Sequence, residues 1–341
     1  MVITLLIYSM IGSMTGTVVA FYDIGADGKH YMQWSYPDGT TISYVYGDPV
    51  VDNGSVYVTC YNGKVYVINA SRGYSEWKYP ADANTYVGAI IGGSVVADGY
   101  LYFGSSDKYL YAVDTTTKQL QWKKETGGKI WSTPVVYNGT VYMGSFDRKL
   151  YAFDALTGMK KWEFEAGGAI VSTPIVYNGT LYFGSLDRKI YAVNADTGKL
   201  LDGFKPFEAG NWFWSRAVAY NGSIIDCSLD GGVYAIDAGT GAEMWSAKVN
   251  GSIRGNPALV NNLLVVGTDE GNNKGNIYCI NVDTHQEVWN YLTGEATMPA
   301  IHASIGADNN TVYVHTTDQK IYAIDAEHGT YLWSRSTGGS Q

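Results

Sequence analysis

Apolar and polar residues alternate along this chain in short runs that are typical of β-strands. The segment from Trp131 to Gly158 is representative, and residues 171–198 repeat it almost residue for residue. Within it, the runs Pro-Val-Val-Tyr and Val-Tyr-Met-Gly-Ser alternate small, aromatic and β-branched residues, which suits half-buried strands. Asn138-Gly139 separates these runs and favours a two-residue hairpin turn. No stretch shows the sustained 3.6-residue apolar spacing of a long helix.

Each repeat contains two more predicted strands. In the same unit, a turn around Asp147 leads to a third strand, Leu150–Phe153, and the segment Asp154–Gly158 turns into a fourth strand that carries Trp162. Four-stranded units that recur every 40 to 45 residues or so are the mark of a β-propeller. Tryptophan recurs at the fourth-strand position in seven units: Trp34, Trp77, Trp122, Trp162, Trp245, Trp289 and Trp333.

The repeat predicts an all-β, eight-bladed propeller of four-stranded antiparallel blades. The fifth unit is degenerate, because residues 191–198 keep the common phrase but Asp202 stands where tryptophan is expected. We expect Leu201 or Phe204 to fill that space. Since each sheet of a propeller buries its faces only against its neighbours, residues 1–341 should form one domain.

The apolar N-terminal segment, residues 1–11, has the look of a signal-peptide core. No Lys or Arg occurs before Lys29, however, so the positively charged region of such a peptide is missing. The segment 11–21 aligns without gaps to 183–193. We therefore expect strands of the first blade here, in a blade that is incomplete or degenerate because its first hairpin lacks the Asn-Gly turn.

The units resemble those of the pyrroloquinoline-quinone-like repeat propellers, which carry the motif Ala-x-Asp-x-x-x-Gly-x-x-x-Trp. The resemblance covers nearly the whole chain, and it implies that the tryptophan docks between neighbouring blades. It also implies a location outside the cytoplasm, either periplasmic, cell-surface or secreted. Three units carry the full motif: Ala152, Asp154, Gly158 and Trp162; Ala235, Asp237, Gly241 and Trp245; and Ala323, Asp325, Gly329 and Trp333.

Composition excludes several classes of partner. With 23 basic and 32 acidic residues the net charge is −9, which argues against a nucleic-acid surface because such a surface needs a basic stripe. No run approaches 18 apolar residues, so no membrane-spanning helix is expected. Cys60, Cys227 and Cys279 lie in three different units and suit neither a disulfide nor a zinc site. We expect a monomer without a bound metal or cofactor.

Aspartates recur at one turn position in most units. A catalytic carboxylate pair would occur in one place only, whereas an Asp at a turn can accept hydrogen bonds from backbone amides two residues on. We therefore expect a structural role for this set: Asp107, Asp147, Asp187, Asp230, Asp269 and Asp318.

Function is expected where the units differ. Three tryptophans fall outside the repeated position, in connectors that lead from the outer strand of one blade to the inner strand of the next: Trp131, Trp212 and Trp214. In propellers these connectors line one mouth of the central channel. The aligned connectors place further residues there: Tyr46, Asp48, Arg216, Arg254, Asn256 and His302. Aromatic and convergent charged groups in a concavity indicate a binding site for a protein or small ligand. The alternative is that these side chains only plug a wide channel.

Three functions fit this pattern. The first is a non-catalytic scaffold that holds partners in an extracytoplasmic complex, similar to the lipoprotein propeller of the outer-membrane protein assembly machinery. The second is a quinone-dependent alcohol or sugar dehydrogenase, in which calcium polarises pyrroloquinoline quinone. The usual long insertions and adjacent cysteines of such enzymes are absent from this sequence. The third is a lectin-like module that stacks carbohydrate or peptide on the connector tryptophans. The first is preferred, with no catalytic residue assigned.

Overall fold

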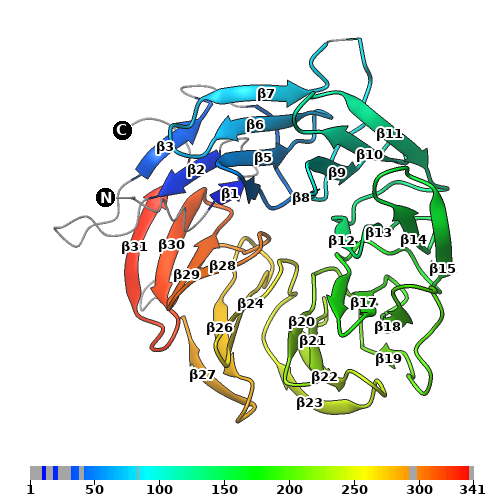
Figure 1. The fold of residues 1–341 in the computed structure, drawn as a ribbon. Helices are drawn as coiled ribbons and strands as arrows, with labels where there is room; N and C mark the ends of the chain where they lie inside the picture. The colour runs from blue at the N-terminus through cyan, green and yellow to red at the C-terminus, as the bar shows by residue number, and fades with distance from the viewer. Residues whose placement is uncertain are drawn as a thin grey trace, which may run out of the picture.

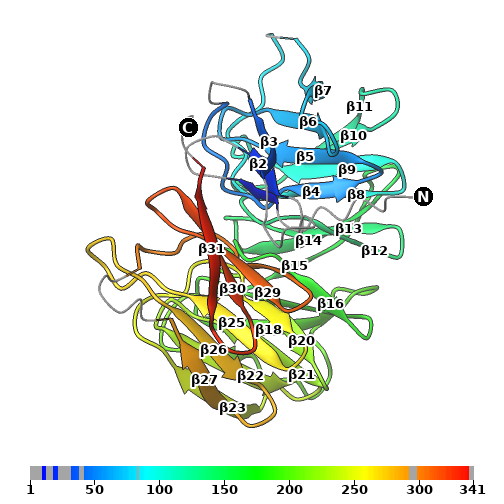
Figure 2. The same ribbon diagram turned by 90° about the vertical axis from the view of Figure 1, so that its left-hand side faces the viewer.

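The computed structural model describes residues 10–12, 18–21, 32–37, 42–82, 84–291 and 298–337. Within these residues the secondary structure consists of β-strands without a helix, and no helix there could cross a membrane. The strands form antiparallel sheets that follow one another around a central channel (Figure 1). The first strand of each sheet lies nearest the channel and the last lies at the outer edge, and the last sheet comes round to the first (Figure 2). The all-β propeller fold is thereby confirmed.

The sheets are numbered here in chain order. Sheet 1 consists of β1 (Met10–Gly12), β2 (Val18–Phe21) and β3 (Met32–Tyr36), and sheet 2 of β4 (Val50–Asp52), β5 (Ser55–Thr59), β6 (Val65–Asn69) and β7 (Ser75–Tyr79). Sheet 3 consists of β8 (Ser94–Ala97), β9 (Tyr100–Gly104), β10 (Tyr109–Asp114) and β11 (Leu120–Glu125). Sheet 4 consists of β12 (Val135–Tyr137), β13 (Thr140–Gly144), β14 (Lys149–Asp154) and β15 (Lys160–Glu165).

The second half of the chain repeats the pattern. Sheet 5 consists of β16 (Ile175–Tyr177), β17 (Thr180–Gly184), β18 (Lys189–Asn194) and β19 (Phe207–Glu208), and sheet 6 of β20 (Val218–Tyr220), β21 (Ser223–Cys227), β22 (Gly232–Asp237) and β23 (Glu243–Lys248). Sheet 7 consists of β24 (Ala258–Val260), β25 (Leu263–Gly267), β26 (Ile277–Asn281) and β27 (Gln286–Asn290). Sheet 8 consists of β28 (Gly306–Asp308), β29 (Thr311–His315), β30 (Lys320–Asp325) and β31 (Tyr331–Ser336).

The prediction of eight four-stranded blades is not matched. Seven sheets have four strands, whereas the described part of sheet 1 has three. In sheet 1, β1 pairs with β2 and β2 with β3, so these strands occupy the second, third and fourth positions of a unit. The segment expected to supply the first strand, residues 1–9, lies outside the described residues.

The hairpins form where the sequence places Asn-Gly. In sheet 4 Tyr137 pairs with Thr140 across the turn, and Asn138 and Gly139 have φ of 47° and 65°. Positive φ at both positions is what a type I′ turn requires, and Asn and Gly adopt it most readily. The hydrophobic clusters lie between sheets: one cluster joins Tyr102, Leu110 and Trp122 of sheet 3 to Val141 and Met143 of sheet 4.

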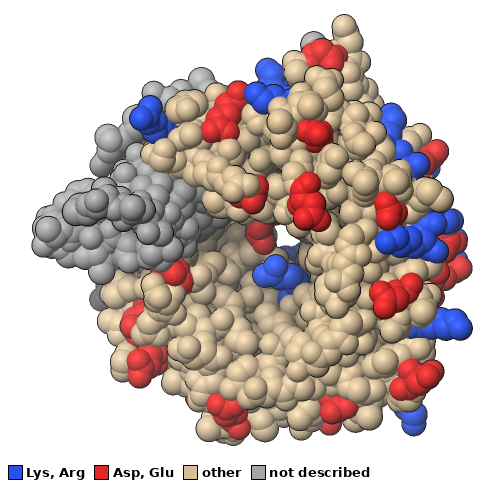
Figure 3. Space-filling model, in the orientation of Figure 1, with Lys and Arg blue, Asp and Glu red and all other residues tan. Residues whose placement is uncertain are grey.

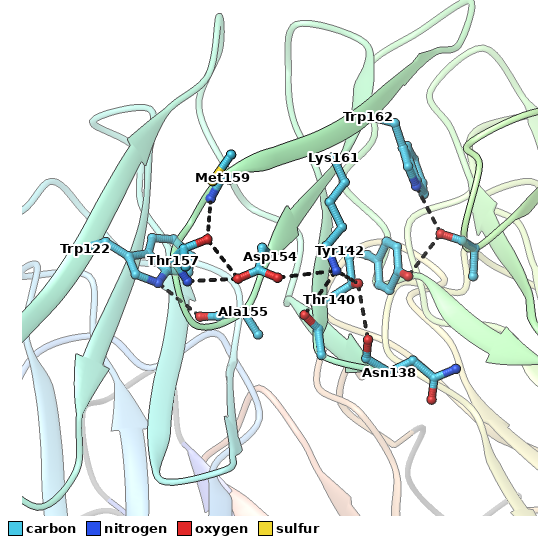
Figure 4. A network of polar contacts seen from close by, with 12 residues as sticks. Trp122, Asn138, Thr140, Tyr142, Asp154, Ala155, Thr157, Met159, Lys161 and Trp162 are labelled. Atoms are coloured by element: carbon cyan, nitrogen blue, oxygen red, sulfur yellow. Dashed lines mark hydrogen bonds and ion pairs between the residues drawn. The ribbon is translucent and has the colours of Figure 1, made fainter.

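Four tryptophans donate a hydrogen bond to the next sheet: Trp34, Trp122, Trp162 and Trp289. Trp122 Nε1 of sheet 3 donates a hydrogen bond of 3.0 Å to Ala155 O of sheet 4, and Figure 4 shows this contact. Gly158 has φ of +66°, and a Cβ there would come within 2.7 Å of the Trp122 ring. Asp154 closes the same turn by accepting hydrogen bonds from Thr157 N and Oγ1. These bonds lower the pKa of Asp154.

The fifth unit uses Phe204 in place of tryptophan. Its side chain is buried and lies 6.2 Å from the ring of Tyr182, much as Trp162 lies 5.6 Å from Tyr142. A Cβ on Gly241 of sheet 6 would come within 3.1 Å of Phe204. Of the two predicted replacements, Phe204 is therefore the one that fills the space.

The recurring aspartates hold turns, as predicted. Asp147 accepts hydrogen bonds from Lys149 N, from Gly127 N and from the Tyr151 hydroxyl. Asp107, Asp187 and Asp230 accept the corresponding bond from the tyrosine four residues on. The cysteines are also as expected, since Cys60, Cys227 and Cys279 are buried and unpaired.

Candidate functional site

The connectors enclose a hollow at the centre of the ring. It has a volume of about 810 Å³, and Figure 3 shows a basic and an acidic group within it. Five of the nine residues predicted at this face line the hollow: Tyr46, Asp48, Arg216, Asn256 and His302. The other four, Trp131, Trp212, Trp214 and Arg254, are not among its lining residues. They lie in the connectors around it.

Close packing between neighbouring connectors fixes the wall of the hollow. A Cβ on Gly47 would come within 2.4 Å of Gly93 N, and one on Gly92 would come within 2.5 Å of Trp131 O. Gly93 N in turn donates to Thr133 Oγ1 at 2.8 Å. Because the connectors touch through backbone atoms, the side chains that they carry are held at defined places around the channel.

A polar chain crosses the hollow. Arg216 N donates to Asn256 Oδ1 at 2.7 Å, and Asn256 Nδ2 donates to Asp48 Oδ2 at 3.1 Å. Asp48 precedes the inner strand of sheet 2, whereas Arg216 and Asn256 precede those of sheets 6 and 7. The Arg216 bond uses the main chain only. Within the described residues its guanidinium forms no ion pair.

A second charged group lies at the mouth. Asp269 Oδ2 is 3.3 Å from Arg254 Nε and 3.0 Å from His302 Nε2, and Asp269 Oδ1 accepts from Gly271 N. Partial burial raises the pKa of Asp269, but the hydrogen bonds from Gly271 and His302 and the charge of Arg254 outweigh it and lower the pKa. Asp269, which was predicted only to hold a turn, therefore also joins two predicted site residues, Arg254 and His302.

The connector tryptophans have different surroundings. Trp131 packs edge-on against Phe146 at 4.5 Å, lies 6.2 Å from Trp214 and donates from Nε1 to Ser106 Oγ. Trp131 and Trp214 are half-buried. Trp212 leaves 45% of its surface exposed. Packing therefore accounts for the buried part of the Trp131 and Trp214 side chains, whereas Trp212 offers aromatic surface that is open to solvent.

A tyrosine cluster beside Tyr46 was missed from the sequence. Tyr44, Tyr46 and Tyr61 lie 6.0 to 6.3 Å from one another, ring centre to ring centre, and each leaves about half of its surface exposed. Tyr44 belongs to the same connector as Tyr46, but Tyr61 comes from the turn between β5 and β6. The turn position of Tyr61 holds Phe146 in sheet 4, so comparing these turns as well as the connectors would have found it.

Comparison with known proteins agrees with the repeat and the ring. The family model described as "Outer membrane protein assembly factor BamB" matches residues 15–123, 81–211 and 206–341. The chain belongs to this family of pyrroloquinoline-quinone-like repeat propellers.

Individual relatives are distant. BamB of Legionella pneumophila (strain Paris) is 27% identical over 77 residues, which are 23% of this chain and 18% of that protein. The crystal structure of BamB from Moraxella catarrhalis has a TM-score of 0.72 at 18% identity and covers 91% of each chain. The quinohemoprotein alcohol dehydrogenase ADHIIG from Pseudomonas putida HK5 has a TM-score of 0.70 at 18% identity, over 86% of this chain and 66% of that one. These structures share the fold with this BamB-family chain, and at such identities the likeness extends no further.

The described residues of this family member offer no donor set that fits calcium. Calcium takes six to eight oxygen ligands, usually from several carboxylates. Among the described residues no group of three or more His, Cys, Asp and Glu could hold a metal ion, and the one described carboxylate in the hollow, Asp48, is bonded to Asn256. The calcium site required by the quinone-dependent alternative is therefore not formed by the described residues.

Two further titratable groups are buried, Asp226 and His315. Asp226 of β21 is fully buried, and its Oδ1 accepts hydrogen bonds from Cys227 N and Ser215 Oγ. Burial raises the pKa of Asp226 to about 8. His315 lines the hollow, and burial lowers its pKa to about 4, so it is uncharged at neutral pH.

Proposed function

We propose that this chain is a non-catalytic, monomeric propeller that binds a protein partner or ligand at the channel mouth, in a complex outside the cytoplasm. The observation that carries the proposal is the convergence of side chains on the connector face. Exposed aromatic rings, Trp212 and the cluster of Tyr44, Tyr46 and Tyr61, surround a hollow that also presents charged groups. Aromatic and arginine side chains are the commonest anchors of protein interfaces.

Membership of the BamB family supports a protein partner, because the family's description names outer membrane protein assembly. That description also supports a location outside the cytoplasm. The described residues add no catalytic arrangement: the recurring carboxylates hold turns, and Asp269 is paired with Arg254 and His302. Both the partner and the location are part of the proposal.

A capture experiment tests the proposal. The bait is the full chain, as wild type or as the double variant Trp212→Ala/Arg254→Ala, and proteins recovered from the native source are identified by mass spectrometry. Loss of aromatic and arginine anchors that a partner buries should weaken the binding of that partner by about thirtyfold or more. A matched control is Leu156→Ala/Met159→Ala, which removes exposed apolar side chains next to the turn between the third and fourth strands of sheet 4. That turn lies at the opposite end of the strands from the connectors.

The outcomes separate binding from packing. The proposal predicts that wild type and control recover the same partner, that the connector variant does not, and that all three melt within a few degrees of one another. Equal recovery by all three would place the partner site elsewhere. A much lower melting temperature for the connector variant alone would mean that these two side chains contribute to packing and not to binding.

The exposed rings also favour a second candidate, a module that stacks carbohydrate. Aromatic faces with a polar edge, such as those of Tyr44 and Trp212, suit sugar rings. A glycan array with wild type and Tyr44→Ala distinguishes this candidate, because it predicts a glycan bound only by wild type.

A further inference from the structure

The interior of the hollow has the lining of a small-molecule pocket. Its volume of about 810 Å³ falls in the range of pockets that hold drug-sized ligands. Most of the wall is apolar, in part because three connectors end in a Pro-Val or Pro-Ile pair at the start of an inner strand: Pro49-Val50, Pro134-Val135 and Pro174-Ile175. Such walls bury the apolar surface of a ligand, and the few polar groups among them decide its chemistry.

Those polar groups include one cation and one anion. Among the described lining residues, Arg216 is the sole Lys or Arg and Asp48 the sole Asp or Glu. Asp48 uses Oδ2 to accept from Asn256, and within the described part of the chain its Oδ1 has no hydrogen-bond donor. The guanidinium of Arg216 has no acidic partner there either. The two charges lie on sheets 6 and 2, and Asn256 links the Arg216 main chain to the Asp48 carboxylate.

We propose that the hollow binds a short apolar peptide of two or three residues with free termini, its carboxylate on Arg216 and its ammonium on Asp48. The arginine fork presents parallel N–H donors that match the two oxygens of a carboxylate. The hydroxyl of Thr133, which accepts from Gly93 N through its oxygen, adds a further O–H donor to the pocket. This inference deepens the proposed function by naming the ligand class of the hollow, and so it rests on that function.

Charge balance favours this ligand over the other classes. A singly charged anion would pair with Arg216 but leave Asp48 without a counter-charge. A singly charged cation would pair with Asp48 but leave Arg216 without one. A polyanion such as a phosphate ester would bring two or more negative charges to one arginine in a chain whose net charge is −9. Asp48 and Arg216 are exposed to solvent in the free protein, and a ligand that fills the hollow displaces their water. A ligand with one charge of each sign then leaves neither group unpaired, and an unpaired charge without water is costly.

Isothermal titration calorimetry with blocked peptides tests each contact separately. The probes are the dipeptide Val-Leu and the tripeptide Val-Ala-Leu, each with free termini, with an N-terminal acetyl group, or with a C-terminal amide. The proteins are wild type, Arg216→Gln, Asp48→Asn, and Arg148→Gln as a control that removes an exposed arginine paired with Glu165. Arg216→Gln keeps the main-chain bond to Asn256, and Asp48→Asn keeps an oxygen that can accept from Asn256, so both variants should fold.

The expected result is a matched pattern of losses. For wild type and Arg148→Gln, acetylation or amidation should each weaken binding about tenfold or more, the usual effect of losing a charge-assisted hydrogen bond. For Arg216→Gln, amidation should make little further difference, and for Asp48→Asn the same should hold for acetylation. Equal binding of free and blocked peptides, or losses that are the same in all four proteins, would overturn the proposal, as would absence of binding by wild type up to millimolar peptide. The capture experiment varies Trp212 and Arg254 instead, so either proposal can fail without the other.

Discussion

The buried carboxyl of Asp226 makes a sharp prediction about stability and pH. It occupies a second-strand position of sheet 6 where sheets 4 and 5 have Met143 and Phe183. Its Oδ2 has no hydrogen-bond partner among the described residues. Burial raises its pKa from an ordinary value of 3.8 to about 8. Because the folded state holds this proton and the unfolded state releases it, stability is fully present below pH 4 and falls as the pH rises towards 8.

The magnitude follows from the pKa. Each pH unit between the unfolded-state and folded-state pKa of Asp226 lowers the free energy of unfolding by about 1.4 kcal/mol. Ionisation of Asp226 in the unfolded chain therefore removes about 5 kcal/mol of stability by pH 8. Asp226→Asn removes this pH dependence. It retains an oxygen that can accept from Cys227 N and Ser215, but its amide group needs a new partner, at a cost of about 1 to 3 kcal/mol. The variant should therefore be less stable than wild type at pH 4 and more stable by about 3 kcal/mol at pH 8.

The assay is urea unfolding followed by tryptophan fluorescence at intervals from pH 4 to pH 9. Asp154→Asn is the control. The pKa of Asp154 is lowered by hydrogen bonds from Thr157, so its contribution is lost only as the pH falls below its ordinary pKa, and this variant should differ from wild type by a constant above pH 5. The thiol of neighbouring Cys227 has a pKa raised well above 9 and does not titrate in this range. A difference between Asp226→Asn and wild type that stayed constant with pH would refute the reasoning.

Two further predictions concern the contacts between sheets. Trp122→Ala should destabilise the fold by about 3 to 5 kcal/mol, as for other large buried aromatics, and a melting curve that did not move would show that the ring is not packed against sheet 4. Gly158→Ala should cost more than Gly139→Ala, because both glycines have φ near +65° but only at position 158 does the added Cβ meet the Trp122 ring. Gly139→Ala should cost about 1 kcal/mol from backbone conformation alone. Equal losses of stability for the two glycine variants in chemical denaturation would mean that Trp122 shifts without penalty.

Features that repeat along the chain were predictable from the sequence. The Asn-Gly hairpins, the turn aspartates and the unpaired cysteines follow from local chemistry, and local chemistry is the same in each unit. The replacement of tryptophan by Phe204 was also predictable, since Leu201 and Phe204 flank Asp202 within two residues. The four-stranded first blade was not matched, because the repeat is weakest in that unit and its described strands are β1, β2 and β3.

Features that depend on ring closure were only partly predictable. Aligned connectors located Arg216, Asn256 and Asp48 at equivalent positions, but the bonds that link them across the hollow depend on the diameter of the ring. Tyr61 was missed because it lies in the turn between β5 and β6 and not in a connector, and this turn meets the connector of Tyr44 in the folded ring. The carboxyl of Asp226 was missed because one polar residue in an alternating strand looks exposed until the neighbouring sheet is in place.

The most direct test of the central claim, that the connector face is the binding face, is a hydrogen–deuterium exchange footprint of the full chain with and without the partner recovered by capture. We predict slower exchange on binding in the connectors around residues 42–48, 128–133, 210–216 and 252–256, with no change in the 1–2 and 3–4 turns at the other end of the strands. Protection confined to those turns or to the outer strands, with the connectors unchanged, would contradict the account.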